Sequence, residues 1–288
     1  MTITAQMVKE LREKTGAGIL DAKKALVEND GDMEKAMEFL RQKGIASADK
    51  KMGRIAAEGV VCTIVEDNQG AIVEVNCETD FVAKNEEFKE FVNCLAKTIL
   101  KTQPADVETL LASKACCDDT KTVEDKIKEK IATIGEKITL RRFETYEGNL
   151  ATYVHNGKIG VMLKTSQKDD ALAKDICLHI ASCAPQFISR EEIPQEVIDE
   201  ETRIEMGKED LAKKPENIRA KIVEGRVNKL MSHKCLLEQP FVKDPNQTIS
   251  QLIEGKFDII KFTRFELGEG LEKKQENFAQ EVMEQMKK

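Results

Sequence analysis

The residues best placed for specific chemistry in this chain are an acid and a large aromatic side by side, Asp80 and Phe81. The run Ile72–Val75 before them alternates as a strand does, and apolar residues after them recur at three- and four-residue steps. This pattern predicts a helix from about Asp80 to Leu100, which Thr79 or Asp80 would cap. Residues at such a turn can be presented to a partner, so Asp80 and Phe81 are candidate binding residues. The alternative is that Asp80 only caps the helix while Phe81 packs inward.

Sequence motifs for covalent chemistry or nucleotide binding are missing from the chain. There is no Walker A sequence, no GxSxG and no HExxH. The pairs Gly16-x-Gly18 and Gly268-x-Gly270 are better explained as turns than as a dinucleotide fingerprint. His155, at a predicted hairpin tip, and Asp80 would need a nucleophile to form a catalytic relay, and none is apparent. We therefore expect no enzymatic activity, no cofactor and no direct nucleotide binding.

The composition narrows the possible partners and the compartment. The 288 residues are enough for about two domains. A formal net charge of -7 argues against wholesale binding to nucleic acid or to an anionic membrane, because both need a basic surface. The N-terminus lacks the basic head and apolar run of a signal peptide, and no stretch approaches the roughly 18 apolar residues of a membrane span. We expect a cytoplasmic protein that uses neither nucleic acid nor membrane as a partner.

The cysteines and histidines show no pattern of metal ligands or disulfides. The 8 cysteines contain no CxxC, and the 3 histidines are scattered along the chain. We expect no metal site and eight free thiols, most of them acting as small hydrophobic residues. His179, on an apolar helix face, is expected to be semi-buried with satisfied hydrogen bonds.

Residues 1–54 have the pattern of a three-helix module. Thr4 is a suitable cap for the first helix and Asp32 for the third. The glycines of Gly16–Gly18 separate the first two helices, and Gly44 is expected to end the third. A module this small buries little apolar surface and is marginally stable alone.

The rest of the chain predicts an α+β fold with a duplicated core and antiparallel sheets. Residues 55–146 contain a predicted hairpin, helices and a strand. Residues 147–193 begin with a second hairpin around Asn156-Gly157, followed by a helix. Residues 232–267 return to this second half and end in a strand, Ile259–Leu267. Because hairpin and helix occur twice, we expect a duplication, with chance patterning as the alternative.

Two helical segments complete the expected domain organisation. Residues 194–231 predict an inserted helical hairpin, similar to a coiled coil. Residues 268–288 predict an amphipathic C-terminal helix, which can dock on its own domain or on a partner. The apolar seam expected in the helical hairpin consists of Val197, Ile204, Leu211, Ile218 and Ile222.

Ordered motifs along essentially the whole chain resemble the elongation factor Ts family. Each motif is weak alone, and their order makes the resemblance specific. The motifs are Val8-Lys-Glu-Leu-Arg12, Thr15-Gly-Ala-Gly18, Asp21-Ala-Lys-Lys-Ala-Leu26, Val75-Asn-Cys-Glu-Thr-Asp-Phe-Val-Ala-Lys84, Ile159-Gly-Val161, Val223-Glu-Gly-Arg226, Gln239-Pro-Phe-Val242 and Arg264-Phe-Glu-x-Gly-Glu-Gly-Leu-Glu272.

The resemblance implies a translation elongation factor that acts as a guanine-nucleotide exchange factor. Such a factor binds elongation factor Tu·GDP and inserts the pair matching Asp80 and Phe81 near the Mg²⁺ and nucleotide site. The resemblance implies that Thr79, Asp80, Phe81 and Val82 together contact the GTPase there and dislocate its Mg²⁺. GDP then leaves and GTP can reload, without the formation of a covalent bond.

The resemblance also implies further contacts with the GTPase. Leu11, Ile19 and Leu20 match positions that the family's ubiquitin-associated-like (UBA-like) N-terminal module uses against elongation factor Tu, the alternative being that all three are core residues. The core hairpin near His155 and the C-terminal helix should supply the remaining contacts. The family uses the helical hairpin for contacts between exchange factors, so self-association through it is open.

Two other classes of function stay open at this point. A pure adaptor would form a complex without changing nucleotide release. An enzyme with an unrecognised site would carry a perturbed buried acid or histidine in a deep pocket.

Overall fold

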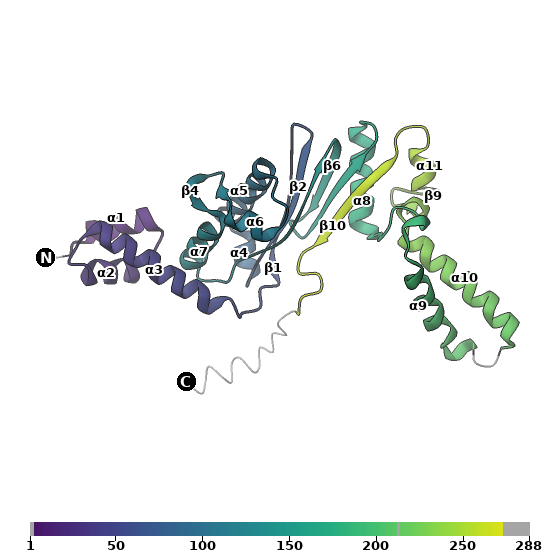
Figure 1. Ribbon diagram of the computed structural model, residues 1–288, viewed down its shortest axis with the longest axis horizontal. Coiled ribbons are helices and arrows are strands. Elements are labelled where there is room, and N and C mark those ends of the chain that lie inside the picture. Colours follow the sequence, from purple (N-terminus) through teal and green to yellow (C-terminus); the bar gives the residue numbers. More distant parts are fainter. Residues whose placement is uncertain (1–2, 212–213, 273–288) are drawn as a thin grey trace. The chain divides into compact units, whose positions relative to one another are not determined.

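The computed structural model describes residues 3–211 and 214–272 as a mixture of helices and antiparallel sheets (Figure 1). The expected α+β class is confirmed. The chain forms two compact units, one made of Met1–Ile64, Ala71–Thr145 and Phe265–Lys288 and the other of Val65–Gly70 and Tyr146–Arg264. Most of the expected C-terminal helix, from residue 273 onward, lies outside the described residues. Within the described part of the chain, no helix combines the length and apolar character needed to cross a bilayer.

Three helices form a small N-terminal module with its own core. They are α1 (Ala5–Thr15), α2 (Ile19–Glu28) and α3 (Met33–Lys51). Both predicted caps are confirmed, because the Thr4 hydroxyl accepts the backbone N–H of Met7 and the Asp32 carboxylate accepts that of Lys35. Gly16 ends α1 with a φ of 67°, a left-handed conformation that glycine adopts without strain. The core between the three helices is formed by Val8, Leu11, Ala22, Ala25, Leu26 and Ala36.

The prediction that Gly44 ends the third helix is wrong. Helix α3 continues to Lys51 and packs against α7 (Val123–Ile134). A Cβ at position 44 would lie only 2.8 Å from the Cβ of Ala132. Gly44 therefore permits a close approach between two helices, and this packing outweighs the roughly 1 kcal/mol by which glycine disfavours a helix interior.

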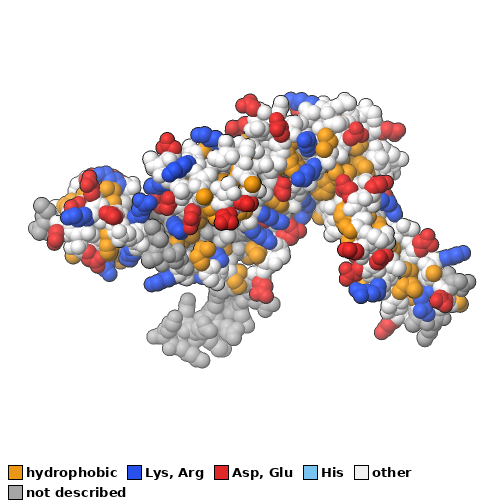
Figure 2. Space-filling view, viewed as in Figure 1, with side chains coloured by type: hydrophobic (Ala, Val, Ile, Leu, Met, Phe, Trp, Pro, Cys, Tyr) orange, Lys and Arg blue, Asp and Glu red, His pale blue; other side chains and the backbone are white. Residues whose placement is uncertain are grey.

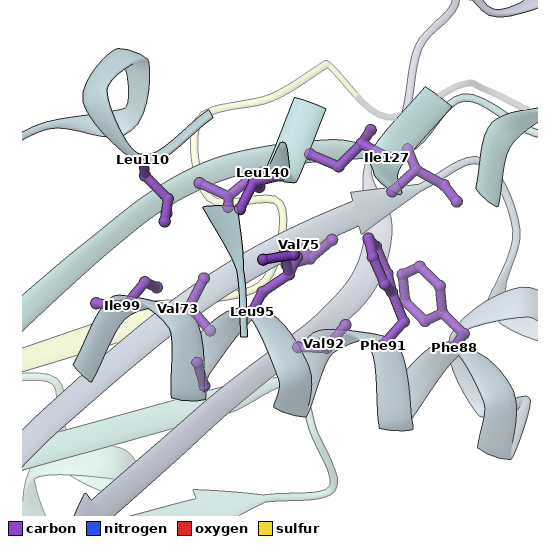
Figure 3. Packing of buried hydrophobic residues seen from close by; sticks show 14 of the residues in the cluster. Val73, Val75, Phe88, Phe91, Val92, Leu95, Ile99, Leu110, Ile127 and Leu140 are labelled. Atoms are coloured by element: carbon purple, nitrogen blue, oxygen red, sulfur yellow. The ribbon is translucent and has the colours of Figure 1, made fainter. Parts of the chain in front are cut away.

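The first core lies between a sheet and a long helix. The sheet has the order β1-β2-β5, and the helix is α5 (Glu86–Thr102). The strands are β1 (Glu58–Glu66), β2 (Gln69–Cys77) and β5 (Thr139–Glu147). Figure 3 shows apolar side chains on one face of α5 that point toward Val73 and Val75 of β2. The α5 side chains shown there are Phe88, Phe91, Val92, Leu95 and Ile99.

The expected single helix from Asp80 to Leu100 consists of two helices. The short helix α4 (Asp80–Lys84) is separated from α5 by Asn85, whose ψ of 130° is extended. Asn85 also caps α5, since its side-chain oxygen accepts the backbone N–H of Glu87 at 2.8 Å. The break frees α4 from the orientation of α5, so Asp80 and Phe81 need not follow the apolar face that begins at Phe88.

The second half of the chain contains the same order of elements. Strands β6 (Asn149–His155) and β7 (Ile159–Thr165) pair antiparallel and are followed by helix α8 (Asp170–Cys183). Strand β10 (Ile259–Glu266) completes a sheet of order β10-β7-β6. In both sheets the second strand of the hairpin is central and the last strand of the repeat lies beside it.

A small hairpin that leads into a helix also occurs in both halves, and the sequence pattern does not predict it. In the first half it is β3 (Lys114–Ala115) and β4 (Asp118–Thr122), preceded by helix α6 (Val107–Ala112) and followed by α7. In the second half it is β8 (Pro240–Phe241) and β9 (Asp244–Thr248), followed by α11 (Ile249–Ile253). Both hairpins have the same register, and a threonine opens a capping box at the start of each following helix. Strands this short carry no detectable alternation.

The helical pair inserted after α8 is formed by α9 (Gln195–Met206) and α10 (Glu216–Lys234). The predicted seam is wrong at two positions, because Ile204 and Ile218 are exposed. The predicted Leu211 is buried, and Val197 and Ile222 pack against the same cluster. The other buried contacts are made by Val223, Val227 and Met231 of α10. Both exposed residues lie next to the connection between the two helices, Ile204 near the end of α9 and Ile218 near the start of α10.

A buried carboxylate holds the segment that follows β10. Glu74 of β2 accepts hydrogen bonds from Arg141 at 2.9 Å, from Arg142 at 2.6 Å and from the backbone N–H of Gly268 at 2.9 Å. Burial alone would raise the pKa of Glu74. The three donors together have the larger effect and lower it, so the pKa lies below its ordinary value. Gly268 has a φ of 70°, and a Cβ there would lie 2.5 Å from the carbonyl oxygen of Ala57. The Gly268 turn is therefore structural.

The expectation of eight free thiols is wrong for one pair. Cys94 of α5 forms a disulfide with Cys117, which lies at the turn between β3 and β4. The two residues are 23 apart in sequence, and only the packing of the small hairpin against α5 brings them together. The other six cysteines are free.

Candidate functional site

The turn after β2 presents Phe81 to solvent. Phe81 is 82% exposed in the first turn of α4, and the core of its unit is complete without it. The alternative that Phe81 packs inward is therefore contradicted. Burial of an exposed phenylalanine side chain in a complex would contribute about 2–3 kcal/mol to the binding free energy.

Asp80 lies beside Phe81 and forms an ion pair within its own helix. Its Oδ2 atom is 2.6 Å from Nζ of Lys84, one helical turn away. The hydrogen bond to Asp80 raises the pKa of Lys84. Both side chains are exposed, so water screens the pair and a partner could displace Lys84 at little cost.

Thr79 caps α4 and is itself held by Glu136, a residue in the loop after α7. Its hydroxyl oxygen accepts the backbone N–H of Val82 at 3.4 Å. The hydroxyl also donates to Oε1 of Glu136 at 2.6 Å. Oε2 of Glu136 accepts the backbone N–H groups of Glu78 at 3.1 Å and Thr79 at 3.0 Å. One carboxylate thus satisfies three donors in the turn that carries Asp80 and Phe81.

Glu78 makes the reciprocal contact with the Glu136 loop. Its Oε1 atom accepts the backbone N–H of Lys137 at 2.6 Å, and Arg54 pairs with it at 3.2 Å. Nζ of Lys137 in turn donates to the carbonyl oxygens of Met52 and Arg54. The turn is therefore braced from two sides, by the loop after α7 and by the segment after α3.

The remaining residues at the turn face inward and offer no nucleophile. Val82 packs against the core of the unit. Cys77 is buried, and burial, with a smaller effect from the nearby Glu136 charge, raises its pKa to about 12. The Cys77 thiol is therefore neutral at physiological pH and is not an activated nucleophile.

The N-terminal module divides its candidate residues between surface and core. Ile19 is 58% exposed and Leu20 is 82% exposed at the start of α2, immediately after Gly18. Leu11 is fully buried in the module's core. The expectation that Leu11 contacts a partner is therefore corrected, because α1 turns that side chain toward α2 and α3.

His155 lies at an exposed hairpin tip in the other unit. It ends β6, opposite Ile159 of β7. Its Nδ1 atom is 3.1 Å from the hydroxyl of Tyr153, and its Nε2 atom is 3.2 Å from Nδ2 of Asn156. These contacts orient the ring, and no nucleophile accompanies it.

Glu136 is the site residue that sequence reasoning missed. The one local signal is its position directly after Gly135, which ends α7 with a φ of 86°. That signal places Glu136 in a loop. It does not aim the side chain at Thr79, which is 57 residues away in sequence.

Comparison with known proteins gives the family of the chain. A family model described as Elongation factor TS matches residues 78–269, a span that begins at the braced turn. The chain belongs to the elongation factor Ts family. Elongation factor Ts of Thioalkalivibrio sulfidiphilus is 48% identical over 294 residues, covering 100% of this chain and 99% of the relative. Elongation factor Ts of Clostridium novyi is 48% identical over 302 residues, covering 99% of each. Membership in the elongation factor Ts family gives the chain a role in translation elongation.

Proposed function

We propose that the chain promotes GDP release from elongation factor Tu by inserting Asp80 and Phe81 near the Mg²⁺ and nucleotide site, after which GTP reloads. The observation that carries this proposal is the exposure of Phe81 on a turn braced by Glu136 and Glu78. Residues that insert into a partner must be both accessible and held in place, because a mobile side chain loses conformational entropy on binding. Family membership supports the same function.

The proposed exchange works through differential binding and makes no covalent bond. The chain must bind the nucleotide-free GTPase more tightly than the GDP-bound form, and linkage requires that GDP weakens the complex by the same factor. Reversing a 1:99 preference takes about 5.5 kcal/mol of differential binding. Burial of Phe81 supplies about 2–3 kcal/mol, so other surfaces must contribute.

We assign the additional contacts to three places. Ile19 and Leu20 form an exposed apolar pair on the N-terminal module, which we propose to be UBA-like. The hairpin tip at His155 and the C-terminal segment 268–288 are the other two. This assignment keeps the proposed domain organisation, with an N-terminal module at 1–54, core subdomains at 55–146 and at 147–193 with 232–267, and a coiled-coil-like hairpin at 194–231 that is open to self-association.

The surface charge agrees with a protein partner. Acidic and basic side chains are interspersed over the face shown in Figure 2, with apolar side chains between them. Nucleic-acid binding would call for a clustered basic surface. A role in translation elongation would place the protein's work in the cytoplasm.

A GDP-release assay tests the proposal. Elongation factor Tu loaded with a fluorescent GDP analogue is mixed with excess unlabelled GDP and a catalytic amount of the chain. We expect faster release with the wild type and with Ile204→Ala, a control at an exposed apolar residue away from the site, and slower release with Phe81→Ala. A stable complex with unchanged release would instead identify an adaptor.

A further inference from the structure

Three cysteine sulfurs gather where the small hairpin of the first half meets α5. Cys94 is disulfide-bonded to Cys117, and the free Sγ of Cys116 lies 3.8 Å from Sγ of Cys94. A separation of 3.8 Å is van der Waals contact between sulfurs. Cys94 therefore has two cysteines within reach, one bonded to it and one free.

Cys116 is held beside Cys94 by contacts that do not involve the disulfide. The fully buried hydroxyl group of Thr98 donates to the carbonyl oxygen of Cys94 at 2.9 Å and accepts the backbone N–H of Cys116 at 3.0 Å. The thiol of Cys116 also donates to the carbonyl oxygen of Cys94 at 3.3 Å. The Thr98 bridge therefore holds the backbone of Cys116 beside Cys94 independently of the Cys94–Cys117 bond.

We propose that Cys94, Cys116 and Cys117 form a thiol–disulfide exchange site in which Cys94 is the shared sulfur. Cys116, after losing its proton to solvent, attacks Sγ of Cys94 as a thiolate. The Cys94–Cys116 bond forms, the Cys94–Cys117 bond breaks, and Cys117 leaves as a thiolate. One disulfide and one thiolate are present before and after the step, so no external oxidant or reductant is needed.

The site faces solvent on the side where the leaving thiolate appears. Cys117 is exposed and Cys116 is partly exposed, at the turn between β3 and β4. The released Cys117 thiolate can attack a small disulfide such as oxidised glutathione, forming a mixed disulfide and releasing one glutathione thiolate. Burial raises the pKa of Cys62, Cys77 and Cys177 instead, which keeps those thiols neutral and unreactive. Because Cys117 is exposed at this turn, small disulfides of the glutathione type are the class of reactant that this site would take.

Mapping of the disulfides in the full-length protein tests the proposal. The protein is incubated in buffer containing oxidised and reduced glutathione, alkylated with iodoacetamide, digested and analysed by tandem mass spectrometry. For the wild type we expect two cross-links, Cys94–Cys117 with Cys116 alkylated and Cys94–Cys116 with Cys117 alkylated or carrying glutathione. Cys117→Ser should retain a cross-link, now Cys94–Cys116. Cys116→Ser should show Cys94–Cys117 alone.

A control variant and the opposing outcomes complete the test. Cys62→Ser, on β1 and outside the cluster, should give the wild-type pattern. Complete alkylation of Cys94 and Cys116 in Cys117→Ser, under conditions that keep the wild-type cross-link, would overturn the proposal. A wild-type protein that contains the Cys94–Cys117 cross-link but no Cys94–Cys116 cross-link, or one in which all eight thiols are alkylated, would also overturn it. The two wild-type cross-links have the same peptide mass when the third cysteine is alkylated, so fragment ions that separate Cys116 from Cys117 identify them. This readout is independent of nucleotide exchange.

Discussion

The carboxylate of Glu136 accepts two hydrogen bonds from Thr79, one from its hydroxyl at 2.6 Å and one from its backbone N–H at 3.0 Å. This contact joins the loop after α7 to the turn after β2. Because Thr79 is also the N-cap of α4, the position of Asp80 and Phe81 depends on a residue that follows them by more than fifty positions in sequence.

Glu136→Ala should weaken nucleotide exchange, although Glu136 is not one of the two residues, Asp80 and Phe81, that we propose to contact the nucleotide site. Loss of the carboxylate leaves three donors of the turn without their acceptor, at a cost of about 1–3 kcal/mol for each donor that stays buried. Glu136→Gln keeps one carbonyl acceptor and should lie between the wild type and alanine. GDP release and thermal unfolding of each variant check this, with exposed Glu90→Ala as the control. Full exchange by folded Glu136→Ala would show that the brace is dispensable.

Phe81→Ala should damage exchange more than folding. The side chain is exposed, so its removal leaves the core of the unit unchanged. If its burial is realised mainly in the transition state for GDP release, release should slow by roughly 30- to 150-fold. Asp80→Ala should have the smaller effect, because Lys84 already pairs with the acid. A melting temperature lowered as in a core mutant, with full exchange by the folded fraction, would contradict the assignment of Phe81.

The double substitution Ile19→Ser with Leu20→Ser should weaken complex formation with elongation factor Tu and leave the module folded. Both side chains are exposed at the start of α2. Leu11→Ala should act in the opposite way, destabilising the module by about 2–5 kcal/mol through a core cavity. Affinity measured by calorimetry and helicity measured by circular dichroism separate the two effects. Unchanged affinity of the double variant would remove Ile19 and Leu20 from the interface.

His179 should make folding stability fall as the pH is lowered. It is fully buried and neutral, with Nδ1 accepting the backbone N–H of Val242 at 3.2 Å and Nε2 lying 2.8 Å from Oε1 of Gln239. Burial lowers its pKa, although the hydrogen bond to Gln239 acts the other way. Stability is therefore complete above the unfolded pKa, near 6.5, and is lost as the pH falls toward the lower folded value.

Denaturant unfolding at a series of pH values measures the His179 contribution. The loss should reach at most about 1.4 kcal/mol per pH unit for the one proton involved. His179→Gln, which does not titrate, should show a shallower fall below pH 6.5 even if its stability at neutral pH is lower. Parallel curves for the two proteins would show that His179 is not responsible.

Replacing residues 194–231 with a short linker should leave nucleotide exchange in place. The chain segments on either side of residues 194–231 are joined directly. The backbone N–H groups of Leu236 and Leu237 donate to the carbonyl oxygens of Phe187 and Ile188 at 2.9 and 3.1 Å. The apolar side chains of the pair mostly contact one another. The GDP-release assay on the shortened protein checks this. Loss of exchange in a shortened protein that still folds would assign the helical pair a direct role.

The sequence alone determined the features that depend on near neighbours. The caps at Thr4 and Asp32, the hairpin turn at Asn156-Gly157 and the helical face from Phe88 to Ile99 follow from hydrogen bonds and periodicities that span a few residues. The α+β class and the location of the Asp80-Phe81 turn were predictable for the same reason, and the ordered motifs indicated the family.

Only the tertiary structure decided which of these residues are buried and which distant residues hold them. Leu11 and Leu20 are both leucines beside Gly16–Gly18, yet one is buried and the other exposed, because burial depends on which helix face meets the rest of the module. The reach of Glu136 to Thr79 and the pairing of Cys94 with Cys117 join residues 57 and 23 apart. Such contacts leave no local pattern, since they arise only when whole elements have packed against one another.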